Sequence, residues 1–132
     1  MPSERQCARG KIFVFVVEER DSDLNGVLLP AFFEMAGADK KSGMVGYRDF
    51  LAGKEITADV LILRFSAMHE DTGGLRASLE AFKGPNPKSA VVLCTILVDK
   101  AKQLGSLVDI IHQDVVFDTD LMEEGTRIAD SK

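Results

Sequence analysis

The chain has 132 residues, of which 45% are hydrophobic and 28% are charged, and this is typical of one compact domain. Its 16 basic and 21 acidic residues give a net charge of -5, which disfavours general binding of a nucleic-acid backbone. The longest apolar runs are well short of the ~20 residues that cross a bilayer. Residues 1–10 lack the apolar segment of a secretory signal. We therefore expect a cytoplasmic protein without a membrane span.

The opening of the sequence predicts a β-hairpin. Residues 11–17 are β-branched and aromatic, which indicates a strand. Asn25-Gly26 is typical of a tight turn between two strands. The apolar stretch that follows can be interpreted as a helix or as a second strand over residues 27–33. Pro30 favours the strand, because a proline in the interior of a helix costs about 3 kcal/mol.

Helices and strands are expected to alternate along the rest of the chain, in segments whose apolar residues recur at helical spacing or form short continuous runs. In chain order we first predict a helix over 39–52, a central buried strand over 59–65, and a helix with Leu75, Leu79 and Phe82 on one face. A buried strand over 90–97 and a helix with Ala101, Leu104 and Ile111 on one face come next. The chain then continues with a short strand near 115–117 and ends with a helix capped by Thr119 or Asp120.

This order, β-β-α-β-α-β-α-β-α, predicts the α/β class: one domain over residues 11–129, with helices packed on a central, mostly parallel sheet. Residues 1–10 are then an N-terminal arm and residues 130–132 a C-terminal tail.

The segment that joins the predicted central strand to the next helix is the main candidate site. It contains Asp71, Thr72, Gly73 and Gly74. The two glycines allow close approach of another group, and the free N–H groups at a helix start favour an anion. In open α/β sheets this edge also meets ligands and partners. The alternative is a plain helix cap, in which Asp71 or Thr72 accepts the first N–H groups.

Asp71-Thr72-Gly73-Gly74-Leu75 resembles the Asp-Ser-Ser-Gly-Leu loop of STAS domains, the sulphate transporter and anti-sigma factor antagonist family. The strand Val-Val-Leu-Cys-Thr-Ile and the later Val116-Phe117-Asp118-Thr119 follow in the order of that family. The resemblance implies a non-catalytic regulatory domain that presents residues 66–75 and the following helix to a regulatory kinase or another signalling protein. Gly73 occupies the usual phosphoacceptor position of the family, which leaves Thr72 as the possible phosphoacceptor.

The sequence also resembles the receiver domains of response regulators. This resemblance puts Glu18 and Glu19 at the metal-binding acidic pair, Arg64 at the phosphoacceptor aspartate, Thr95 at the switch hydroxyl and His112 at the lysine. Only Thr95 keeps the chemistry of the family. The resemblance therefore implies a pseudo-receiver that signals by docking alone.

A third hypothesis is an enzyme, because His69, Glu70 and Asp71 are adjacent in sequence, but no nucleophile or metal-ligand cluster accompanies them. We expect no catalytic residue, cofactor or metal. Cys7 and Cys94 are far apart in the sequence, which suits two reduced thiols.

Overall fold

A computed structural model describes residues 11–17, 41–64, 72–95, 98–112 and 119–132 of the chain. Its strands are β1 (Phe13–Val17), β2 (Gly43–Gly46), β3 (Val60–Arg64), β4 (Ala90–Cys94) and β5 (Ile110–His112). Its helices are α2 (Tyr47–Leu51), α3 (Thr72–Lys83), α4 (Val98–Lys102) and α5 (Thr119–Ser131), with a 3₁₀ turn at Gly105–Leu107. From β3 onward, the described strands and helices alternate in the order that the sequence predicts.

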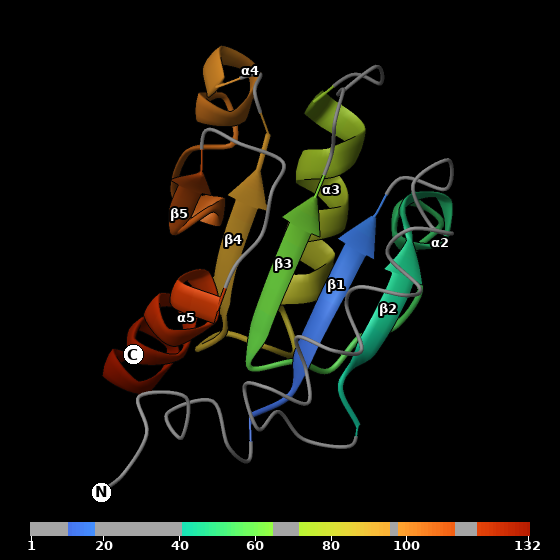
Figure 1. Ribbon diagram of the computed structural model, residues 1–132. Coiled ribbons are helices and arrows are strands. Elements are labelled where there is room, and N and C mark those ends of the chain that lie inside the picture. The colour runs from blue at the N-terminus through green and yellow to red at the C-terminus, as the bar shows by residue number, and fades with distance from the viewer. Residues whose placement is uncertain (1–10, 18–40, 65–71, 96–97, 113–118) are drawn as a thin grey trace, which may run out of the picture.

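The five strands form one sheet, and every neighbouring pair is parallel, in the order β2-β1-β3-β4-β5 (Figure 1). The predicted α/β class and single parallel sheet are therefore confirmed. β3 is the central strand, as its apolar run predicts, and its first four residues are fully buried. This strand order is the one found in flavodoxins and in receiver domains.

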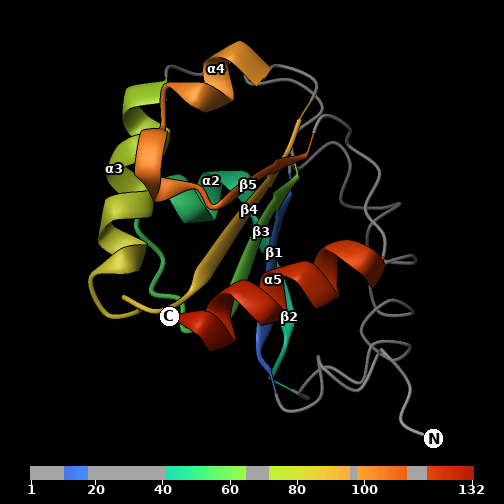
Figure 2. The ribbon, with the colours of Figure 1, turned by 90° about the vertical axis from the view of Figure 1, so that its left-hand side faces the viewer.

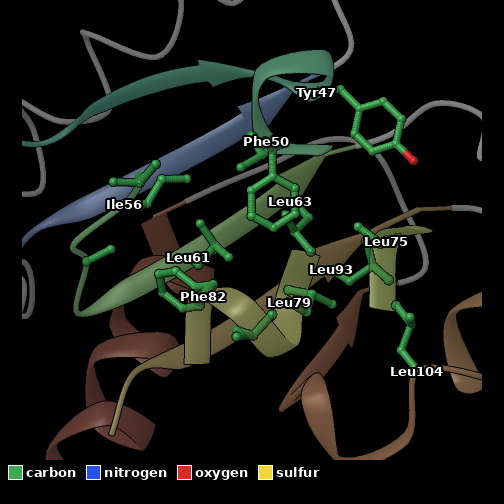
Figure 3. Packing of buried hydrophobic residues seen from close by; sticks show 14 of the residues in the cluster. Tyr47, Phe50, Ile56, Leu61, Leu63, Leu75, Leu79, Phe82, Leu93 and Leu104 are labelled. Carbon is green, nitrogen blue, oxygen red and sulfur yellow. The ribbon is translucent and has the colours of Figure 1, made fainter. Parts of the chain in front are cut away.

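Helices cover both faces of the sheet (Figure 2). α2 and α3 pack on one face and α5 packs on the other, where it contacts β3 and β4. Leu75, Leu79 and Phe82 of α3 are buried, which confirms the face predicted from their spacing. Figure 3 shows these side chains packed against leucines of β3 and β4 and against Phe50 of α2. The last predicted helix is also confirmed, with Met122 buried against the sheet.

The predicted opening hairpin is wrong in its pairing. Residues 27–33 lie outside the described residues, but the place predicted for them beside β1 is taken. β1 pairs with β2 along one edge and with β3 along the other, both in parallel. A strand has only two hydrogen-bonding edges, so no antiparallel partner can pair with β1.

The predicted helix over 39–52 is correct only in its second half. Residues Gly43–Gly46 form the edge strand β2, and the helix begins at Tyr47. Glycine destabilises a helix by about 1 kcal/mol relative to alanine, so two glycines weaken a helix here while pairing with β1 stabilises an extended chain.

The fifth strand also differs from the prediction. Residues 115–117 lie outside the described residues, and β5 is found at Ile110–His112, where the sequence predicts the end of a helix. α4 already ends at Lys102, and the 3₁₀ turn Gly105–Leu107 follows it. Gly105 interrupts any longer helix, because its φ of 59° is a left-handed conformation that glycine tolerates and other residues rarely adopt.

Candidate functional site at the carboxyl edge of the sheet

The last residues of the five strands form one row across the sheet. The register places Val17 of β1 beside both Gly46 and Arg64, Arg64 beside Cys94, and Cys94 beside His112. The carboxyl ends of parallel strands share one edge, and this edge is where open α/β sheets bind their ligands. We call this row, together with Thr95, the carboxyl edge.

Arg64 is at the centre of the carboxyl edge. It ends the central strand β3 and is half-buried, unlike the four fully buried residues before it. It also lies beside β1, where the strand order reverses direction, since β2 is on one side of β1 and β3 is on the other. This topological switch point is the usual ligand site of the fold. A guanidinium placed there is a permanent positive charge with five hydrogen-bond donors.

Thr95 and His112 join Arg64 at this edge. Thr95 follows β4 directly and is fully buried, and its backbone N–H donates to the carbonyl of His112 at 3.0 Å. The fold therefore brings together the three described residues of the receiver resemblance, Arg64, Thr95 and His112. Glu18 and Glu19 lie outside the described residues.

The start of α3 carries the residues of the other resemblance. α3 begins at Thr72, so Thr72, Gly73 and Gly74 form its first turn, while Asp71 lies outside the described residues. This end of α3 is on the side to which the strand arrows point (Figure 1). The first turn itself, Thr72 to Gly74, contains no acidic residue.

The described ranges contain neither a metal-ligand cluster nor a membrane-spanning helix. No group of three or more His, Cys, Asp or Glu side chains there is arranged to hold a metal ion. Cys94 is a fully buried thiol in β4. Within these ranges, no helix has the length and apolar character needed to cross a membrane.

Sequence reasoning missed the polar groups at the opposite, amino edge of the sheet. There Lys83, Asp109 and Lys132 meet although they are far apart in the sequence. No local motif marks these residues, because only the packing of α3, β5 and α5 brings them together.

The comparisons with known proteins give no family. No protein-family model matches the chain, and no curated protein matches its sequence.

Proposed function

We propose that this chain is a non-catalytic regulatory domain of the pseudo-receiver type, which acts by docking to a signalling protein. The observation that carries the proposal is the position of Arg64. It ends the central strand of a sheet with receiver strand order, at the position where the receiver resemblance expects the phosphoacceptor aspartate.

The chemistry of arginine supports a domain that is not switched by phosphorylation at this position. An acyl phosphate forms on a carboxylate, and a guanidinium offers no such nucleophile. Its permanent positive charge also opposes a divalent cation at the same place. The carboxyl edge would then not alternate between a phosphorylated and an unphosphorylated state at Arg64, and partner binding would need neither Mg²⁺ nor a phosphoryl donor.

The STAS hypothesis is less well supported, because it depends on an opening hairpin in which β1 has an antiparallel partner. Both edges of β1 are instead paired with parallel strands. The STAS resemblance assigns a docking surface, namely residues 66–75 and the following helix α3, and we adopt this surface for the pseudo-receiver proposal. The partner that we propose is the kind that the STAS resemblance implies, a regulatory kinase or another signalling protein, in the cytoplasm.

The proposal can be tested by comparing two surface variants in a binding experiment. Ala77 is exposed on α3, and Thr57 is exposed on the loop before β3. Ala77→Glu adds charge and bulk to the proposed docking surface, whereas Thr57→Glu makes a similar change at the amino edge. A specific partner is expected to bind the unmodified chain and the Thr57 variant and to be lost from the Ala77 variant.

The same experiment tests the independence from phosphorylation. Binding is expected to persist in chelator and to be unchanged when Mg²⁺ and acetyl phosphate are added. Binding that requires either addition would contradict the proposal, as would a partner that binds the Ala77→Glu variant at full strength.

A further inference from the structure

Three charged side chains from different elements meet at the amino edge of the sheet, opposite the proposed docking edge. Lys83 is the last residue of α3, Asp109 precedes β5, and Lys132 follows α5. Lys132 Nζ lies 2.9 Å from Asp109 Oδ1, and Lys83 Nζ lies 3.9 Å from Asp109 Oδ2. The cluster therefore contains two amines and one carboxylate.

Lys132 is the better-placed partner of Asp109. Besides its contact with Oδ1, its Nζ lies 3.0 Å from Oδ2, and Oδ2 also accepts the backbone N–H of Val91 at 2.8 Å. The carboxylate is thus already engaged by a cation and a backbone donor. Lys83 is left as the surplus cation, with a longer and weaker contact.

The two amines also share a second acceptor. The carbonyl of Ser89 accepts from Lys132 Nζ at 3.1 Å and from Lys83 Nζ at 3.4 Å. Two positive charges directed at one carbonyl oxygen repel each other. The side chain of Lys83 is only 19% exposed, so water screens this repulsion incompletely.

These surroundings make the amine of Lys83 easier to deprotonate than that of an ordinary exposed lysine. Burial lowers the pKa of Lys83 below its ordinary value, and the amine of Lys132 lowers this pKa further, whereas Asp109 opposes both effects. A lysine beside another cation is a recognised way to obtain an amine nucleophile near neutral pH. The side chain is 19% exposed, so it is not sealed from solvent.

We propose that Lys83 is an acylation site of this chain, at which an acyl phosphate or a thioester transfers its acyl group to Nζ. The nitrogen lone pair forms a bond to the acyl carbon, and the bond from that carbon to the phosphate oxygen or thiolate sulfur breaks. The leaving group departs with the electron pair, and the proton lost from nitrogen passes to the leaving group. The product is a neutral amide.

The geometry indicates what this modification does locally. An amide at Lys83 removes the surplus charge, while Lys132 stays paired with Asp109 and Asp109 stays bonded to Val91. The fold is therefore expected to tolerate acylation at this position.

The experiment treats the whole chain with a limiting amount of acetyl phosphate and measures acetylation of each lysine by peptide mass spectrometry over a series of pH values. Lys54 and Lys88 are exposed and serve as internal references. Near neutral pH, Lys83 is expected to be acetylated several-fold faster than either reference, and this ratio is expected to fall as the pH rises. A ratio that never exceeds one would overturn the proposal.

Two variants separate the effect of the neighbouring amine from that of burial. Lys132→Gln removes the second cation and is expected to reduce the ratio, whereas Lys132→Arg keeps the cation and is expected to preserve it. Thermal unfolding of both variants verifies that they are folded. A ratio that is the same in the glutamine variant, the arginine variant and the unmodified chain would also overturn the proposal. None of these results depends on partner binding at the carboxyl edge.

Discussion

Gly125 of α5 and Val60 of β3 pack so closely that a β-carbon added to Gly125 would lie 2.9 Å from Cγ1 of Val60. Val60 is fully buried in the central strand, so neither its side chain nor the strand has room to move away. Position 125 therefore needs glycine because of packing, although glycine weakens a helix.

Gly125→Ala is expected to lower the free energy of unfolding. Overpacking costs about 1–3 kcal/mol, and the better helix propensity of alanine recovers about 1 kcal/mol of it. Urea denaturation measures the net loss. Gly84→Ala is the matched control, since a β-carbon there would meet only an ordinary contact of 3.6 Å. Equal effects of the two substitutions would contradict the close contact.

Asn86 connects the end of α3 to the loop before β3. Its buried side-chain Nδ2 donates to the carbonyls of Ile56 and Phe82, both at 2.9 Å, and its Oδ1 accepts the N–H of Ala58 at 3.3 Å. Asn86→Ala leaves these three backbone groups without this partner, and we expect a loss of about 1–3 kcal/mol in unfolding free energy. Chemical denaturation measures the loss, with the exposed Lys88→Ala as control. A loss no greater than that of the control would contradict this role.

The sequence predicts best the elements whose apolar pattern leaves one interpretation. The continuous apolar runs of β3 and β4 are typical of strands covered on both faces, and both strands are fully buried except at Arg64. The spacing of Leu75, Leu79 and Phe82 likewise predicts the buried face of α3.

The errors in the first half of the chain arise from contacts distant in sequence. Local preferences favour a hairpin at Asn25-Gly26, but they contain no information about the other segments that occupy both edges of β1. β2 contains only four residues, and it is extended because it pairs with β1. Ser42 supports this pairing, since its Oγ accepts the N–H of Phe13 at 2.9 Å.

The candidate site was predictable in part. The place of His112 at the end of a strand was not predicted, because the sequence predicts the end of a helix there and a short strand near 115–117. Arg64 and Thr95 lie near the ends of the predicted strands 59–65 and 90–97, so their place at a sheet edge follows from the sequence. The alignment of Arg64 with Cys94 and His112 does not, because register depends on the pairing of the whole sheet.

Lys83 and Lys11 have pKa values that shift in opposite directions, and they should give opposite pH dependences of stability. Burial and Lys132 lower the pKa of Lys83 in the folded chain. At pH values between this lowered pKa and the ordinary lysine pKa, the unfolded chain therefore binds more protons than the folded chain. Stability due to Lys83 therefore rises with pH in that window. The stability of the unmodified chain relative to Lys83→Met should accordingly increase from neutral to alkaline pH in urea denaturation.

Lys11 provides the opposite case for comparison. Its hydrogen bond to Asp130 raises the pKa of Lys11, so its stabilising effect is present below the ordinary lysine pKa and is lost as the pH rises through the raised value. The stability of the unmodified chain relative to Lys11→Met should therefore decrease at strongly alkaline pH. The same trend for both variants would contradict these assignments.

Substitutions of Thr72 test whether the start of α3 favours a negative charge. The first turn of this helix has no acidic residue, and a negative charge near a helix N-terminus stabilises it by about 0.3–1 kcal/mol. Thr72→Glu should therefore raise the free energy of unfolding relative to the neutral Thr72→Gln, and high salt should reduce the difference. A phosphate on Thr72 would act in the same direction. If the two variants are equally stable at low salt, the helix start does not favour a charge at this residue.

A substitution of Arg64 tests the pseudo-receiver hypothesis most directly. Arg64→Asp replaces a fixed positive charge at the end of β3 with the carboxylate that a receiver carries there. Glu18 and Glu19, which follow β1 in the sequence, are the residues that the receiver resemblance assigns to the acidic pair. We expect added Mg²⁺ to raise the melting temperature of this variant, because an ion that binds only the folded state stabilises it. The unmodified chain should show no such rise.

Arg64→Gln separates the new carboxylate from the loss of the guanidinium. Both substitutions remove the positive charge, but only aspartate supplies an oxygen ligand of the kind that Mg²⁺ prefers. The glutamine variant should therefore remain insensitive to Mg²⁺. A comparable Mg²⁺ response in all three proteins would show that Arg64 does not prevent metal binding. No response in the aspartate variant would show that this edge lacks the acidic pair of a receiver, and the docking surface would then need another basis.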